Sequence, residues 1–318
     1  MIRALAITGP TASGKTALSI RIAEALGCEI ISCDSMQIYK EMDIGTAKAT
    51  AEEQRAIRHH MIDILSPNEP FSAKAYRDMA LPIASEISRR GKIPLFVGGT
   101  GLYLSTLMRS ENGEVPESDP EYRSALESKI KCEEDKIALH ERLRAVDPIS
   151  AEQVHYNNVR RVIRALEIYD STGKPKSYFD ELSRQKSPDI SVSHVTLDFH
   201  DRSLLYERAD GRVDEMLKAG LVEEVARLLD SGMLNEDYTS AQAIGYKEII
   251  RALRGEVSIA EATEELKQAT RNYAKRQLTW FRHDNSATRI WVDTDEGRLR
   301  DKEELFCECL SVFRDAIK

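Results

Sequence analysis

The protein has 318 residues, a length that predicts about two domains. Its 42% hydrophobic and 31% charged residues are typical of a globular protein with a sizeable core, which excludes wholesale disorder. Apolar runs such as 4–7 and 93–97 are far shorter than the roughly 20 residues of a membrane-spanning helix. We therefore expect a cytoplasmic protein without a membrane span.

The chain begins with strands and helices in alternation. Residues 3–8 form an apolar stretch typical of a short buried strand, and residues 17–26 predict an amphipathic helix that Gly27 closes. Further strands are predicted at 28–33 and 92–97. Because strands that alternate with helices usually pair in parallel, the pattern indicates an α/β fold, with a parallel sheet core flanked by helices.

The middle of the chain has a different texture. Between about 110 and 193, charged helical stretches are interrupted by proline and glycine, which predicts a helical insertion. After it, residues 194–199 alternate like a strand, and residues 212–229 carry apolar side chains at helical spacing. We expect three segments, namely a first part of the core at 1–112, an inserted helical domain at 113–193 and a second part of the core at 194–318.

Residues 9–16 match the phosphate-binding loop of P-loop NTPases, with the required strand before and helix after. In such a loop, glycines let backbone N–H groups surround phosphate oxygens, and the helix start adds partial positive charge. Lys15 adds a full charge, and the Thr16 hydroxyl can hold Mg²⁺. The pattern predicts a phosphate site made of Gly9, Pro10, Thr11, Ala12, Ser13, Gly14, Lys15 and Thr16.

The rest of this site departs from that of an NTP-hydrolysing enzyme. The strand at 92–97 runs into Gly98, Gly99, Thr100 and Gly101 rather than into a magnesium-binding acid. The nearest carboxylate is Asp34, which follows a strand and should lie at the carboxyl edge of the sheet, where α/β proteins bind ligands. Its position alone is compatible with a general base, a metal ligand or the cap of the next turn.

Positive charge gathers near the end of the chain, although the net charge is −8. Residues 267–289 contain six basic side chains and one acid, with Tyr273, Trp280 and Phe281 between them. This composition can line a path for the phosphates and bases of a nucleic acid. It is equally compatible with a solvated helix face whose aromatic side chains pack into the core.

The cysteines and histidines do not indicate a metal centre. Five cysteines are scattered without a Cys-x-x-Cys pair, which argues against a disulfide framework and a zinc finger. His59 and His60 are adjacent, so they would point in different directions on any regular element. We interpret these side chains as structural.

Seven segments in the same order make the chain resemble the bacterial tRNA dimethylallyltransferases, also called tRNA isopentenyltransferases. The segments are 9–16, 34–48, 59–63, 97–104, 160–167, 243–248 and 274–282. The resemblance implies a P-loop core with a helical insertion. It also implies transfer of a dimethylallyl group from dimethylallyl diphosphate to the exocyclic N6 of the adenosine 3′ to the anticodon (tRNA position 37), with release of diphosphate. The expected partner is the anticodon stem-loop of tRNA, the expected cofactor is Mg²⁺, and we expect a monomer.

The resemblance also implies roles for individual residues. Asp34 would accept a proton from the adenosine, Thr100 would contact the reacting groups, and Lys15 would stabilise the departing diphosphate. Arg212 would reach the same diphosphate. Contacts with tRNA are implied for Asp34, Ser35, Met36, Gln37, Thr100, Tyr122, Arg160, Arg161, Arg164, Gly245, Tyr246, Lys275, Arg276, Gln277, Trp280 and Arg282.

Three other functions remain open from the sequence. A small-metabolite kinase would use the same phosphate loop, but the strand end at 98–101 has no acid. A prenyltransferase acting on free AMP or ADP would share the chemistry, but the insertion and the basic stretch favour a polynucleotide. A non-catalytic RNA-binding module would leave the phosphate loop and Asp34 unexplained.

Overall fold

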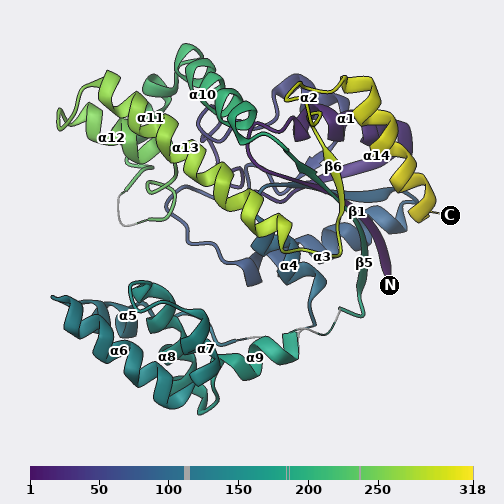
Figure 1. The fold of residues 1–318 in the computed structure, drawn as a ribbon. Helices are drawn as coiled ribbons and strands as arrows, with labels where there is room; N and C mark the ends of the chain where they lie inside the picture. The colour runs from purple at the N-terminus through teal and green to yellow at the C-terminus, as the bar shows by residue number, and fades with distance from the viewer. Residues whose placement is uncertain (111–114, 184, 186, 236–237, 318) are drawn as a thin grey trace. The chain divides into compact units, whose positions relative to one another are not determined.

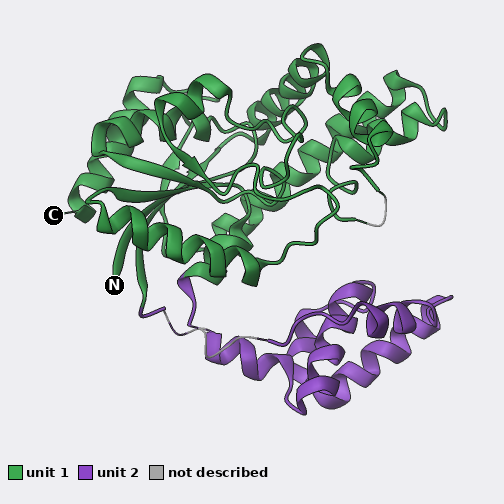
Figure 2. Ribbon diagram, turned by 180° about the vertical axis from the view of Figure 1, so that it is seen from behind, with its two compact units in different colours: residues 1–107, 189–318 green, residues 108–188 purple. Residues whose placement is uncertain are grey.

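The computed structural model describes residues 1–110, 115–183, 185, 187–235 and 238–317. The chain divides into two compact units (Figure 2), unit 1 made of residues 1–107 and 189–318 and unit 2 of residues 108–188. The insertion expected at 113–193 therefore ends earlier than predicted. Ser191 and Ser193 made this stretch resemble a loop, but both belong to a strand of the sheet. The other expected boundary, at 112–113, lies outside the described residues.

Unit 1 is built on a six-stranded parallel sheet with the strand order β3-β2-β4-β1-β5-β6 (Figure 1). The strands are β1 (Ile2–Thr8), β2 (Cys28–Ser32), β3 (His59–His60), β4 (Ile93–Gly98), β5 (Ile190–Asp198) and β6 (Thr288–Trp291). The register pairs Thr8 with Gly98, and Ser32 with Val97. The loops that follow β1, β2 and β4 therefore begin side by side at one edge of the sheet. The predicted α/β architecture is confirmed.

Helices cover both faces of this sheet. The helices outside the insertion, whether they cover the sheet or not, are α1 (Lys15–Leu26), α2 (Ala51–Ala56), α3 (Ala73–Arg89), α4 (Gly101–Met108), α10 (Arg202–Lys218), α11 (Leu221–Asp230), α12 (Tyr246–Leu253), α13 (Ile259–Arg282) and α14 (Lys302–Ile317). Helices α1 and α14 pack together on one face, where Leu18 and Ile22 meet Leu5 and Ile7 of β1, and α3 covers the other face. Among the described residues, no helix is both long and apolar enough to cross a membrane.

A second apolar core lies next to the sheet. Ile38 and Met42, in the segment after β2, pack with side chains of α10, α11, α12 and α13 such as Val213, Ile249 and Leu266. This arrangement holds helices α10 and α13 beside the loops that leave the sheet. The single helix predicted over 212–229 is in fact two helices, because Gly220 has a φ of +99° between α10 and α11. A left-handed φ of this kind suits glycine and ends the helix.

Unit 2 is entirely helical in its described part. Its helices are α5 (Pro120–Glu127), α6 (Glu133–Val146), α7 (Pro148–Gln153), α8 (Val159–Thr172) and α9 (Lys176–Ser183). Leu143, Val162 and Leu166 form its apolar core. Aspartates cap two of the helices, because Asp119 and Asp147 each accept an N–H from the first turn that follows them.

Most of the basic stretch at 267–289 is neutralised by acids that are remote in sequence. The pairs are Lys267 with Asp214 at 2.7 Å, Arg271 with Asp210 at 2.6 Å, Arg282 with Asp198 at 2.8 Å and Arg289 with Asp198 at 3.2 Å. Four of the six basic side chains of this stretch are therefore paired inside the protein. Lys275 and Arg276 are the members that remain exposed without appearing in these pairs.

Asp198 should be a stability determinant. Its carboxylate is buried and faces both Arg282 and Arg289, so Asp198→Asn leaves two guanidinium groups beside a neutral amide. We expect the free energy of unfolding to fall by about 2–3 kcal/mol. The matched control Asp210→Asn breaks a more exposed pair, that with Arg271, which lies on α13 like Arg282. This substitution should lower the free energy of unfolding by less than about 1 kcal/mol. Equal decreases in the free energy of unfolding of the two variants, measured by urea denaturation, would contradict this role of Asp198.

Candidate active site

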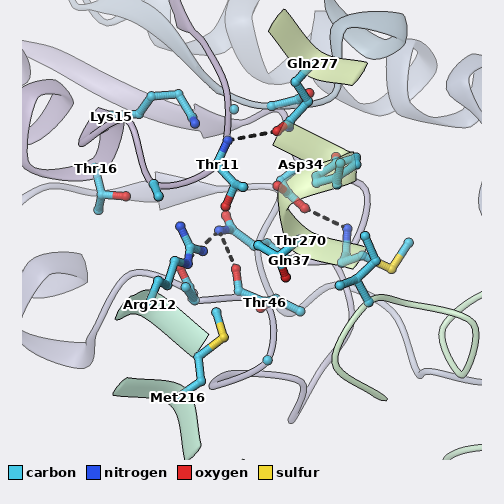
Figure 3. A pocket seen from close by; sticks show the side chains of 18 of the residues that line it. Thr11, Lys15, Thr16, Asp34, Gln37, Thr46, Arg212, Met216, Thr270 and Gln277 are labelled. Atoms are coloured by element: carbon cyan, nitrogen blue, oxygen red, sulfur yellow. Dashed lines mark hydrogen bonds between the residues drawn. The ribbon is translucent and has the colours of Figure 1, made fainter. Parts of the chain in front are cut away.

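Three loops at the carboxyl edge of the sheet surround one cavity (Figure 3). The phosphate loop 9–16 follows β1, the turn 33–37 follows β2, and the loop 98–101 follows β4. Helices α10 and α13 supply further walls, and the cavity volume is about 760 Å³. The structure thus brings Lys15, Asp34 and Arg212 to one site, at the edge where parallel α/β folds bind ligands.

The phosphate loop has the backbone geometry that an anion site needs. Gly9 has a φ of +147°, and a Cβ there would lie 2.9 Å from the carbonyl oxygen of Leu197. Gly14 has a φ of +91° and occupies the cap position of α1. Because Gly14 has no side chain to cap the first turn, the N–H groups of Lys15 and Thr16 are left to a ligand. Thr16 also lines the cavity with its hydroxyl side chain.

Lys15 lies folded over its own loop. Its Nζ donates to the carbonyl oxygens of Gly9 at 3.0 Å and Pro10 at 2.6 Å. Burial, and to a smaller extent the positive charge of Arg212, lower the pKa of Lys15 to about 7 against the opposing effect of the negative charge of Asp34. An anionic ligand would favour the protonated amine, so this lysine should take up a proton when such a ligand binds.

Helix α10 adds two arginines to the anion side of the cavity. Arg212 is mostly buried, and its Nε has no hydrogen-bond partner within the described residues. Burial lowers its pKa, and the charge of Asp34 opposes this shift. Arg208, one helical turn earlier, donates from Nε to the carbonyl oxygen of Ala12 at 2.7 Å. A buried donor without a partner is costly, so the predicted role of Arg212 as an anion ligand fits its environment.

Asp34 and Thr100 lie on neighbouring turns that are hydrogen-bonded to each other. Oδ1 of Asp34 accepts the N–H of Met36 at 2.9 Å, so this side chain shapes its own turn as well as lining the cavity. Oγ1 of Thr100 accepts the N–H of Ser35 at 3.1 Å, and the Thr100 N–H donates to the carbonyl oxygen of Cys33 at 3.1 Å. Thr100 therefore fixes the position of the turn that carries Asp34.

Gln37 is held entirely by the protein. Its Nε2 donates to the carbonyl oxygens of Thr46 and Ala47, both at 3.3 Å, and its Oε1 accepts the Ser32 hydroxyl at 3.0 Å (Figure 3 shows its contact with Thr46). The amide of Gln37 thus joins two turns, and its predicted tRNA contact stays a prediction. Ser35 and Met36 line the cavity beside it, as a substrate contact requires.

Glu224 fixes the turn at 43–47, to which Gln37 also donates. Its buried carboxylate accepts the backbone N–H groups of Asp43, Ile44 and Gly45 at 2.8–3.1 Å. The Tyr246 hydroxyl donates to the same carboxylate at 2.7 Å. Burial and the charge of Glu224 raise the pKa of Tyr246, so the phenol stays protonated.

Gly245 and Tyr246, for which the resemblance implies tRNA contacts, are both buried. Tyr246 is fully buried, and its ring fills the place where a Cβ on Gly45 would lie, 2.5 Å from the ring edge. Gly245 is also buried, with its N–H bonded to Glu248 at 2.8 Å. Within the segment 243–248, Ala243 and Ile244 line the cavity, whereas Gly245 and Tyr246 do not.

The predicted tRNA contacts on α13 divide into two groups. Lys275, Arg276 and Trp280 are exposed and can reach a large ligand. Gln277 is buried, and Arg282 donates to Asp198 and to the carbonyl oxygen of Phe199. Both side chains are thus held by contacts inside the protein, and their predicted tRNA contacts stay predictions.

Four expected tRNA contacts lie in unit 2. Arg160 and Arg161, at the start of α8, are exposed. Tyr122 donates its hydroxyl to Asp170 at 2.6 Å. Arg164 donates to the buried Glu167 at 2.6 Å and to the carbonyl oxygen of Pro116 at 2.5 Å, so its guanidinium stabilises the unit internally. Arg160 and Arg161 are thus the members of this set that are open to a ligand.

Sequence analysis missed several cavity residues. Arg208 could have been found, because it precedes Arg212 by one helical turn. Tyr273, in the cavity wall, was noted only as part of the basic stretch. Burial and the charge of Asp34 raise its pKa, so its hydroxyl stays protonated next to Thr100. Nothing in the local sequence indicated Glu224, whose backbone partners at 43–45 lie about 180 residues away.

Inorganic diphosphate should bind in a pH-dependent manner that traces to Lys15. Because its pKa is about 7, the ammonium loses its proton as the pH rises from 7 to 9. The Kd of wild type, divided by that of Lys15→Arg, whose side chain stays charged, should rise by up to about tenfold per pH unit in this range. Titration calorimetry measures both, and parallel pH profiles would refute the assignment.

Comparisons with known proteins agree with the geometry. Residues 37–284 match the family model described as IPP transferase. The tRNA dimethylallyltransferase of Geobacillus kaustophilus is 48% identical over 300 residues, which cover 94% of this chain and 93% of that protein. That of Caldanaerobacter subterraneus subsp. tengcongensis is 45% identical over 306 residues, 96% of each chain.

Solved structures give the same result. The full-length tRNA isopentenylpyrophosphate transferase of Bacillus halodurans superimposes with a TM-score of 0.71 at 40% identity, covering 100% of this chain and 97% of that one. A eukaryotic dimethylallyltransferase described as acting on tRNA gives a TM-score of 0.74 at 30% identity, covering 92% and 74%. The resemblance inferred from seven sequence segments is confirmed, and the chain belongs to the IPP transferase family.

Proposed function

We propose that this protein is a tRNA dimethylallyltransferase. It transfers the dimethylallyl group of dimethylallyl diphosphate to the exocyclic N6 of the adenosine 3′ to the anticodon, at tRNA position 37, and releases diphosphate. The observation that carries the proposal is one cavity with two chemically different sides. Lys15, Arg208 and Arg212 make one side cationic, while Asp34 supplies a carboxylate on the other.

The cationic side fits a diphosphate leaving group. When the bond between the allylic carbon and the diphosphate oxygen breaks, its electron pair leaves with the diphosphate, where negative charge accumulates. Donors fixed at the start of α1, together with Lys15 and Arg212, stabilise that charge mainly in the transition state. Such a site does not require the acid of an NTP-hydrolysing enzyme, which accounts for the glycine-rich end of β4.

Asp34 fits the proton acceptor for the nucleophile. The exocyclic amino group of adenine is a weak nucleophile because its lone pair is delocalised into the ring. As the new N6–C bond forms, one N6 proton must leave, and we propose Asp34, whose carboxylate lines the cavity, as its acceptor. Thr100 supports this role, because its hydroxyl holds the turn that carries Asp34.

The residues present fit a magnesium ion that is bound together with diphosphate. Among the described residues, no three His, Cys, Asp or Glu side chains cluster as a metal site. Mg²⁺ usually binds through phosphate oxygens and water with only one or two protein ligands. We propose Thr16 as its ligand, where the ion would neutralise part of the diphosphate charge.

The exposed cations favour a tRNA over a free nucleotide as acceptor. Lys275 on α13 and Arg160 and Arg161 on α8 are exposed, and none of them lines the cavity. A nucleotide bound in the cavity would not reach cations that lie outside it, whereas the phosphates of a tRNA can be neutralised by them. We propose that the protein acts as a monomer.

Asp34→Asn should separate chemistry from binding. The substitution keeps the shape of the side chain but removes its basicity, so the single-turnover rate on bound tRNA should fall by roughly 10²- to 10⁴-fold. The Kd for tRNA should stay within about threefold of wild type. Asp78→Asn, an exposed aspartate on α3, is the control and should retain the full rate. A weaker affinity at an unchanged rate would assign Asp34 to RNA positioning.

A comparison of acceptors tests the choice of tRNA. Wild type should prenylate tRNA and an isolated anticodon stem-loop far more efficiently than AMP, as measured by nucleoside mass spectrometry. The variant Arg160→Ala/Arg161→Ala/Lys275→Ala should weaken tRNA binding and flatten the slope of log affinity against log salt by somewhat under one unit for each phosphate that is no longer neutralised. The control Lys218→Ala/Lys302→Ala/Arg314→Ala removes three exposed cations that do not line the cavity. Efficient AMP prenylation that both variants retain would overturn the tRNA assignment.

A further inference from the structure

Gln277 on α13 contacts both loops that build the two sides of the cavity. Its side chain is 5% exposed. Oε1 accepts the N–H of Thr11 in the phosphate loop at 2.8 Å, and Nε2 donates to the carbonyl oxygen of Gly99 at 2.9 Å (Figure 3 shows the contact with Thr11). A glutamine amide can serve both partners because it presents one acceptor and one donor.

The two loops that Gln277 joins serve different reactants. Thr11 opens the turn that leads to the proposed diphosphate site at the start of α1. Gly99 precedes Thr100, whose hydroxyl accepts the N–H of Ser35 next to Asp34. A continuous set of hydrogen bonds therefore runs from the leaving-group side, through one amide, to the turn that carries the proposed base.

Two glycines of the loop 98–101, Gly99 and Gly101, lie against side chains of α13. A Cβ on Gly99 would lie 2.2 Å from Nε2 of Gln277, and a Cβ on Gly101 would lie 2.0 Å from Nε1 of Trp280. A side chain at either position would displace Gln277 or Trp280, so glycine lets α13 keep these contacts with the loop. The Gly-Gly-Thr-Gly segment is shaped by contact with a helix at these two positions.

We propose that Gln277 is a positioning residue that sets the placement of the departing diphosphate relative to Asp34. The proposal rests on the dimethylallyl transfer proposed above. In that reaction the allylic carbon must lie between the diphosphate and N6 when one bond breaks and the other forms, and an error of about 1 Å can cost about 10²-fold in rate. We call the two hydrogen bonds of Gln277, to Thr11 and to Gly99, the clamp. Without the clamp, each loop can still bind its own reactant, but the separation of the two reactants is no longer fixed.

The first test separates rate from affinity. Gln277→Leu removes both hydrogen bonds at similar size, and we expect the single-turnover rate on preformed complexes to fall by about 10- to 100-fold. The Kd values for inorganic diphosphate and for an anticodon stem-loop should stay within about threefold of wild type. Gln268→Glu, at an exposed position of the same helix, is the control. A rate within threefold of wild type, or equal decreases of rate and affinity, would overturn the proposal.

The second test uses pH. Gln277→Glu keeps the acceptor for Thr11 but, when ionised, has no donor for the carbonyl oxygen of Gly99. Protonation restores that donor, so the rate of Gln277→Glu relative to wild type should rise as the pH falls from 8 to 6. A purely structural role would give a constant ratio, and such a ratio would contradict the clamp.

A third readout is independent of activity. The backbone amide of Thr11 should exchange with deuterium at least tenfold faster in Gln277→Leu than in wild type or Gln268→Glu. If wild type does not prenylate tRNA but the exchange differs as expected, the proposed reaction is wrong and the clamp stands. If wild type is active and neither rate nor exchange changes in Gln277→Leu, the clamp is wrong and the reaction stands.

Discussion

The parallel pairing of β4 between β1 and β2 is the constraint on which the site depends. Because the three strands run in the same direction, the phosphate loop, the Asp34 turn and the Gly-Gly-Thr-Gly loop leave the same edge of the sheet. Elements that are about 90 residues apart in the chain become neighbours through backbone pairing alone. Helix α13 then joins two of these loops through Gln277, and Thr100 joins the third.

The cavity gathers positively charged side chains although the net charge of the molecule is negative. The net charge is −8, yet the cavity gathers Lys15, Arg208, Arg212 and Arg276. Burial lowers the pKa of Lys15 and Arg212, so a cavity without an anion is unfavourable for their charged forms. An anionic ligand relieves this cost, which makes the site selective for a highly charged group such as a diphosphate.

The sequence predicted those parts of the molecule that are encoded locally. The phosphate loop is a consecutive pattern, and Asp34 was found because it ends a strand. Contacts between remote segments were not predictable in this way. The buried partners of Arg282 and Tyr246 are Asp198 and Glu224, 84 and 22 residues away, and only the fold brings them together.

The same limit applies to the predicted tRNA contacts. A family motif marks a residue as part of the functional region, but it does not say whether that residue touches the substrate or supports the cavity wall. Gly245, Tyr246 and Gln277 support the wall, because their polar atoms or their volume are already used inside the protein. The boundary of the helical insertion was misplaced for a related reason, since alternating serines in β5 have little strand character of their own.

The central claim is that one cavity holds the leaving group and the base on opposite sides of the reacting carbon. The most direct measurement is a crystal structure of the protein with an unreactive thio analogue of dimethylallyl diphosphate and an anticodon stem-loop. We expect the diphosphate at the start of α1, in contact with Lys15 and Arg212, and the adenosine N6 within hydrogen-bond distance of Asp34. A diphosphate bound away from the phosphate loop, or an N6 that is remote from Asp34, would contradict the account.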